Sequence, residues 1–333
     1  MTSRLQMYGL AMTPLFFYAA IELLTFRLNN PVISGLAPKF DDSSAYYENA
    51  TRYTLQAAVV FLFWVAVGAV GLLMRDILAK VGISGLLRRS TAQDLGPKHA
   101  RMDLAFFLFY VGFAIYASTW FGSIAGENRN FQNLGTGLFV EVMNHCHVVL
   151  NQPQSCVFGE YRPALPPSGL GTYLNLTTFV TIVGLVASAL GCCRAVMLTD
   201  AEVSRHPGRD IFRGPRLYLY VSSTLFTAAT LCIYGWSGWP VPFLDGADLT
   251  AYRSLQNGLA LFWATSFSLI VLTFYLPVML ALYARIADQP NPDAGSEGKP
   301  QSVVKIVDSA LAILVPVIAA LLSHAGASFV DAL

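Results

Sequence analysis

Seven stretches of the chain are apolar over nearly their whole length and contain almost no charge. A helix needs roughly 20 apolar residues to cross a hydrocarbon core about 30 Å thick. Irregular backbone cannot face lipid without leaving unpaired N–H and C=O groups, so each stretch predicts a membrane helix. The predicted spans are 8–26, 54–74, 103–123, 173–197, 217–239, 258–284 and 306–325. The seventh is short and contains Pro316 and His324, so an interfacial helix remains an alternative there.

Composition supports an all-α, polytopic membrane helix bundle of about seven transmembrane helices. The chain is 55% hydrophobic and 12% charged, whereas soluble domains are about 25% charged. The first apolar run lacks a convincing cleavage site and is interpreted as a retained span. The net charge of +1 and the lack of a basic stripe argue against nucleic acid as a partner. The expected partners are the lipid bilayer and either a second copy or another membrane protein.

The basic residues predict that the N-terminus lies in the cytoplasm. With that orientation, 15 of the 21 lysines and arginines fall in inner segments and 6 in outer ones, as expected from their cytoplasmic bias. Trp120, Trp236 and Trp239 fall at outer helix ends, where tryptophan often anchors a helix in the interface. The Ala/Gly/Leu-rich composition favours a bacterial inner membrane.

The predicted spans divide the chain into a bundle, a linker and a last helix. Residues 1–285 form a six-helix transmembrane bundle with two long outer loops, 27–53 and 124–172. Residues 286–302 are rich in Pro, Gly and Asp and predict a flexible cytoplasmic linker. Residues 303–333 hold the C-terminal membrane helix.

Similar residues at the span ends raise the hypothesis of three hairpin repeats followed by the C-terminal helix. Spans one, three and five follow an arginine, and near the start of spans two, four and six a tyrosine precedes a leucine and a polar residue. The residues are Arg4, Arg101 and Arg216, then Tyr53, Tyr173 and Tyr252; Phe63-Trp64 and Phe262-Trp263 extend the likeness. Parallel repeats of this kind occur in some transporters. Interface preferences for Arg and Tyr explain the same pattern without any repeat.

The second outer loop holds the candidate covalent and metal chemistry. Cys146 and Cys156 are ten residues apart, and in an oxidising compartment they predict a disulfide. His145 and His147 flank Cys146 and offer a weak alternative as zinc or copper ligands. Metal binding needs the Cys146 thiolate, so the two interpretations compete. No other cofactor is predicted.

Polar residues inside the spans predict a solute path. Hydroxyls in span five lie on one helical face, span six adds two more, and span one carries an acid. These residues are Ser223, Thr227 and Thr230, then Ser266 and Thr273, and Glu22. A carboxyl in hydrocarbon is costly, so Glu22 is either a cation or proton site or reaches the nearby interface. Hydroxyl stripes also occur as packing seams between membrane helices, which leaves a purely structural alternative.

These features favour a channel or transporter for a small solute or ion. The alternatives are a non-catalytic membrane subunit or effector that acts through protein partners, and a membrane redox or metal-binding protein. The chain has no glycine-rich phosphate loop, HExxH pair or nucleophile elbow. No span carries two histidines on one face for a haem. No catalytic residue is therefore predicted, and an enzyme is the less favoured class.

Overall fold

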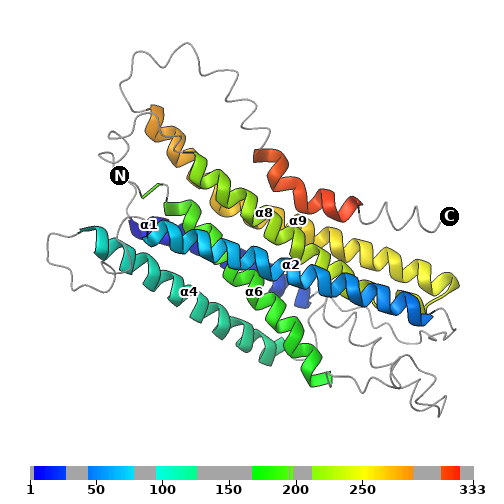
Figure 1. The fold of residues 1–333 in the computed structure, drawn as a ribbon. Coiled ribbons are helices and arrows are strands. Elements are labelled where there is room, and N and C mark those ends of the chain that lie inside the picture. The colour runs from blue at the N-terminus through cyan, green and yellow to red at the C-terminus, as the bar shows by residue number, and fades with distance from the viewer. Residues whose placement is uncertain are drawn as a thin grey trace.

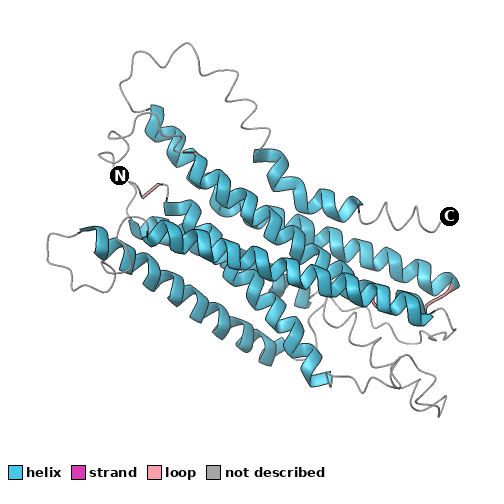
Figure 2. Cartoon of the chain, viewed as in Figure 1, coloured by secondary structure: helices cyan, strands magenta, loops and turns pink. Residues whose placement is uncertain are grey.

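The computed structural model describes residues 4–27, 44–78, 95–125, 167–194, 196–197, 212–287 and 309–322, and every regular element among them is a helix (Figures 1 and 2). The helices are α1 (Arg4–Arg27), α2 (Ser44–Leu78), α4 (Leu95–Ala125), α6 (Pro167–Arg194), α8 (Arg213–Gly238), the 3₁₀ turn η2 (Val241–Phe243) and α9 (Gly246–Ala287). A last helix covers Ser309–Leu322.

Four of the described helices are long and apolar enough to cross a membrane, which makes a membrane protein plausible. They are Tyr53–Leu78, Leu174–Arg194, Arg213–Phe243 and Gly246–Ala284. Each of the seven predicted stretches overlaps a described helix, but the structure does not confirm seven spans. The helix Ser309–Leu322 has 14 described residues, which is about 21 Å at 1.5 Å per residue. That length is shorter than a hydrocarbon core.

Two helices extend well beyond the apolar stretches that predicted them. α2 begins at Ser44, inside the predicted outer loop 27–53, and α9 begins at Gly246, twelve residues before the predicted span. Hydropathy detects only the part of a helix that suits hydrocarbon. Backbone hydrogen bonding continues the same helix into polar sequence, because nothing at the membrane boundary interrupts it.

The centre of the bundle is α6, which packs against α1, α2, α4, α8 and α9. Its apolar segment is 72% buried, compared with 28% for α2. Small residues permit this crowding: a Cβ on Gly184 would lie 3.3 Å from Ala66 Cα of α2 and 2.9 Å from the Leu225 side chain of α8. Close backbone approach at small residues is how membrane helices gain packing contacts.

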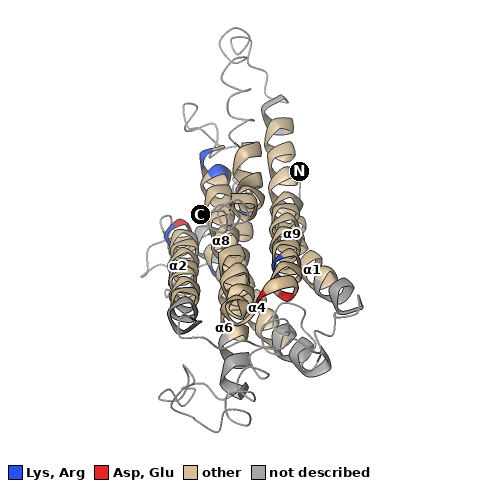
Figure 3. Cartoon of the chain, turned by 90° about the vertical axis from the view of Figure 1, so that its right-hand side faces the viewer, with Lys and Arg blue, Asp and Glu red and all other residues tan. Residues whose placement is uncertain are grey.

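The outward face of α2 is apolar and exposed. Trp64 is 66% exposed and Val60 57%. Acidic and basic residues, by contrast, are few along the described helices and lie toward helix ends, so the helix middles are tan in Figure 3. An apolar girdle without charge suits contact with lipid tails.

The two ends of the bundle differ in chemistry. We call the end where α8 passes through η2 into α9 the turn end, and the opposite end, which holds Arg75, Arg194 and Arg216, the arginine end. At the turn end, the Tyr252 hydroxyl donates to Ser237 O at 2.6 Å and Gln256 Nε2 to Tyr234 O at 3.0 Å. These bonds tie α8 and α9 together beside the turn.

Two of the predicted interface tryptophans are core residues in the structure. Trp236 is 3% exposed and packs with Leu55 and Leu174, and Trp239 is 4% exposed with its ring 5.7 Å from that of Phe243. Their interpretation as interfacial anchors is therefore wrong. Position near a helix end predicts depth along the membrane normal but not whether the side chain faces lipid or protein.

The predicted disulfide between Cys146 and Cys156 and the predicted metal ligands His145 and His147 lie outside the described residues. The three described cysteines, Cys192, Cys193 and Cys232, are buried free thiols. No group of three metal-ligating side chains occurs in the described part of the chain.

Candidate functional site

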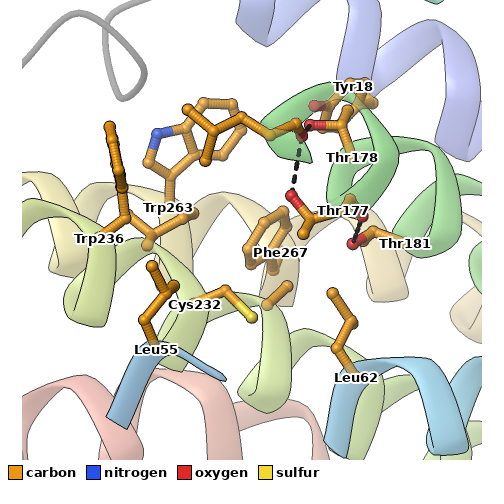
Figure 4. Close-up of a pocket in the computed structure, with 13 residues that line it drawn as sticks. Tyr18, Leu55, Leu62, Thr177, Thr178, Thr181, Cys232, Trp236, Trp263 and Phe267 are labelled. Carbon is orange, nitrogen blue, oxygen red and sulfur yellow. Dashed lines mark hydrogen bonds between the residues drawn. The ribbon is translucent and has the colours of Figure 1, made fainter. Parts of the chain in front are cut away.

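A partly open pocket lies between five helices, toward the turn end (Figure 4). Its thirteen lining residues are Tyr18 from α1, Leu55 and Leu62 from α2, Leu174, Thr177, Thr178 and Thr181 from α6, Ala229, Cys232, Ile233 and Trp236 from α8, and Trp263 and Phe267 from α9. The centre of a water-sized molecule can occupy about 40 Å³ of it. That is room for about three waters.

Three threonines of α6 form the polar wall of the pocket. Thr177 and Thr178 both donate to Leu174 O, at 2.8 and 3.1 Å, and Thr181 donates to Thr177 O at 2.9 Å. Each hydroxyl proton is therefore used within the helix. The remaining lone pairs of these oxygens can only accept a hydrogen bond from an occupant.

Aromatic side chains form the other wall. Trp263 connects the group, since its ring centroid lies 6.0 Å from that of Tyr18 and 5.5 Å from that of Phe267. Trp236 completes the lining in Figure 4. No acidic or basic side chain occurs among the thirteen described lining residues. The pocket thus offers mostly apolar surface, four aromatic rings and three threonine hydroxyls.

At the arginine end, a buried ion pair joins three helices. Asp103 of α4 is 3% exposed; its Oδ2 lies 3.2 Å from Arg194 Nε of α6 and its Oδ1 accepts from the Tyr8 hydroxyl of α1. The Tyr110 hydroxyl donates to Tyr8 O at 2.6 Å and holds that backbone in place. Arg194 Nη1 is buried without a hydrogen-bond partner among the described residues. This network is therefore strong but not fully satisfied.

A second polar contact joins α2 to α8 at the same end. The Tyr218 hydroxyl donates to Asp76 Oδ2 at 2.8 Å, while Asp76 Oδ1 pairs with the exposed Arg75 at 3.0 Å. Gly191 of α6 makes room for the Tyr218 ring, because a Cβ there would lie only 2.2 Å from Tyr218 Cζ. We call Tyr8, Asp76, Asp103, Arg194 and Tyr218 the polar layer.

The predicted path residues whose side chains the structure describes do not line this pocket. Ser223 and Thr230 are buried and donate to Leu219 O and Phe226 O, and the half-buried Thr227 donates to Ser223 O. Each of these hydrogen bonds stays within α8 and satisfies its hydroxyl without a solute, which fits a packing role. The transport role of the stripe stays a prediction.

The remaining path residues lie on α9 and α1. Ser266 is 6% exposed, and the half-buried Thr273 donates to Ile270 O at 2.7 Å. Thr273 O also accepts from Thr13 of α1 at 3.5 Å. The backbone of Glu22 lies in α1, one turn beyond Tyr18, and its side chain lies outside the described part.

Sequence reasoning missed both regions that the structure brings together. Thr177, Thr178 and Thr181 show the same hydroxyl spacing on one helix face that drew attention to span five. Asp103 is the first residue of a predicted span, and an acidic residue there is expected to lie at the membrane surface and contact water. Only its partners, Arg194 from α6 and Tyr8 from α1, distinguish a buried ion pair from an exposed charge.

Comparison with protein-family models, with curated proteins and with solved structures finds no match for the chain.

Proposed function

We propose that the chain is a membrane transporter for a small solute, which binds in the pocket at the turn end. The observation that supports this proposal is the contrast along the bundle axis. A small pocket lies among α1, α2, α6, α8 and α9, and the polar layer fills the same bundle at the arginine end. A partly open pocket near one end of a bundle, with a packed polar layer toward the other end, is the kind of arrangement that alternating access uses.

The polar layer is the closed gate in this proposal. Its contacts join α1 to α4, α4 to α6 and α2 to α8, and four of these five helices also line the pocket. Polar contacts between helices can be exchanged for contacts with water when the helices separate. Opening at this end therefore costs less than exposing an equal area of packed apolar surface would.

The finer topology belongs to the same proposal. Seven spans with a cytoplasmic N-terminus, in a bacterial inner membrane, would place the arginine end inside and the pocket toward the outside. The excess of basic residues in the predicted inner segments supports this orientation. A second copy or a membrane partner protein stays a prediction, with the exposed face of α2 as the surface available to either.

The threefold hairpin repeat is not needed for this function. α4 packs against α6 and α8 against α9, but α1 packs against α6 and α9 and not appreciably against α2 within the described helices. Trp64 is 66% exposed, whereas Trp263, its counterpart in the repeat, is 1% exposed. Unequal packing and unequal environments weigh against the repeat.

Cys232 provides a direct test, because it lines the pocket. In a variant that keeps only this cysteine, with the other four replaced by alanine, we expect a membrane-impermeant methanethiosulfonate to react from the outer side and not from the cytoplasmic side. Tyr8→Phe or Tyr218→Phe removes one hydroxyl from the polar layer without removing a charge. Each should raise the rate of reaction from the cytoplasmic side about fivefold, which corresponds to about 1 kcal/mol for one lost hydrogen bond.

Tyr220→Phe is the matched control, since Tyr220 lies on the same helix and is 44% exposed. It should leave both labelling rates unchanged. Equal reaction from the two sides before any gate substitution would contradict a closed arginine end. Reaction from neither side would contradict an accessible site.

A further inference from the structure

We infer that the pocket takes a small organic cation of the alkylammonium class. This inference rests on the proposed function and names the class of solute that the same site would bind. It follows from three features of the described lining: its aromatic side chains, its hydroxyl lone pairs and its size.

The aromatic wall supplies the attraction. Tyr18, Trp236, Trp263 and Phe267 bring four rings to one small pocket. The face of an aromatic ring is negative, and it attracts a cation by an amount that grows when the cation is desolvated. Quaternary ammonium groups suit such rings best, because their methyl groups contact the ring faces and their weak hydration makes entry less costly.

The threonine hydroxyls also favour a positively charged solute over a negatively charged one. Thr177, Thr178 and Thr181 line the pocket and donate their protons to carbonyls of α6 (Figure 4), so their oxygens can only accept a hydrogen bond from an occupant that reaches them. An anion would meet these oxygens with no basic side chain among the described lining residues to compensate. The wall therefore disfavours anions and favours a positive charge or a hydrogen-bond donor.

Size limits the solute. The pocket has space for about three waters and is partly open, so it suits a compact solute of only a few heavy atoms. Tetramethylammonium and tert-butanol each have five heavy atoms, share a compact branched shape, and differ in charge. They are therefore a matched pair of probes for the inference.

The test measures how well each probe protects Cys232 in the single-cysteine variant from methyl methanethiosulfonate. We expect tetramethylammonium to protect at a concentration about tenfold lower than tert-butanol, as a cation–π contribution of about 1–2 kcal/mol implies. Trp236→Leu should remove most of this difference and Trp236→Phe should keep it. Trp64→Leu, on the exposed face of α2, is the matched control and should leave it unchanged.

Equal protection by the two probes, or better protection by tert-butanol, would overturn the cation inference. The proposed function would still stand if Cys232 kept its one-sided labelling and its response to Tyr218→Phe. Loss of that sidedness would remove the proposed function whichever probe protects. Because the comparison of probes needs no further substitution in the pocket, it remains decisive even if a tryptophan variant fails to fold.

Discussion

The turn end and the arginine end share α1, α2, α6 and α8 but differ in how their polar side chains are bonded. At the turn end, hydroxyl protons are satisfied inside α6 and the space between the helices is left for a solute. At the arginine end, Asp103 bonds to Arg194 and to Tyr8, so that the contacts cross three helices. The α6 threonines therefore add no bond across the pocket, whereas the bonds of the polar layer hold α1, α4 and α6 together. One end of the bundle is therefore suited to binding a solute, and the other is suited to closing the path.

The largest expected effect is at the arginine end. Asp103→Asn leaves the mostly buried Arg194, whose side chain is 18% exposed, without a charged partner and should lower the free energy of unfolding by about 3 kcal/mol. Unfolding of the purified protein in detergent measures this loss. The matched control is Arg75→Gln, which breaks an ion pair whose arginine is 62% exposed and should cost less than about 1 kcal/mol.

A double variant sharpens this prediction. Asp103→Asn together with Arg194→Gln removes both charges and should be more stable than Asp103→Asn alone, because no unpaired charge stays buried. If Asp103→Asn lowered the free energy of unfolding no more than Arg75→Gln does, the ion pair would not hold α4 against α6. The polar layer would then not stabilise the arginine end more than the turn end is stabilised.

An intermediate effect is expected at Gly191. A Cβ there would lie 2.2 Å from Tyr218 Cζ, so Gly191→Ala forces the ring away and weakens its bond to Asp76. Overpacking of this kind should cost about 1–3 kcal/mol. Gly71→Ala adds the same methyl group to α2 where nothing lies within 4 Å, and it should be neutral or slightly stabilising through helix propensity. Thermal unfolding of both variants gives the comparison; equal midpoints would show that Tyr218 can move without loss.

The smallest expected effects on stability come from two threonine variants, one in the pocket and one on the predicted path, that should differ in their effect on solute binding. Thr178→Val and Thr227→Val each remove one hydroxyl bonded within its own helix, and each should change the unfolding free energy by about 0.5 kcal/mol. Only Thr178 lines the pocket. Protection of Cys232 by tetramethylammonium should therefore weaken severalfold in Thr178→Val and hold in Thr227→Val. The reverse result would restore the hydroxyl stripe of α8 as the solute path.

Much of the fold was predictable because a membrane imposes simple rules. Apolar stretches of about 20 residues must be helical in hydrocarbon, and each such stretch here overlaps a described helix. The candidate site was less predictable. Ser223 and Thr177 carry the same kind of side chain in the same kind of pattern. Only the position of α6 at the centre of the bundle puts Thr177 beside a cavity and leaves Ser223 in a seam.

The sequence by itself determined the helical class, the approximate extent of the apolar helices and the scarcity of charge along them, because hydrocarbon acts on each segment independently. It could not determine which face of a helix meets protein. Trp64 and Trp263 occur in the same Phe-Trp pair, yet one is 66% exposed and the other 1%. Lipid and protein interior are both apolar, so hydropathy does not distinguish them, and only the packing of α6 among its neighbours decided where the pocket and the polar layer formed.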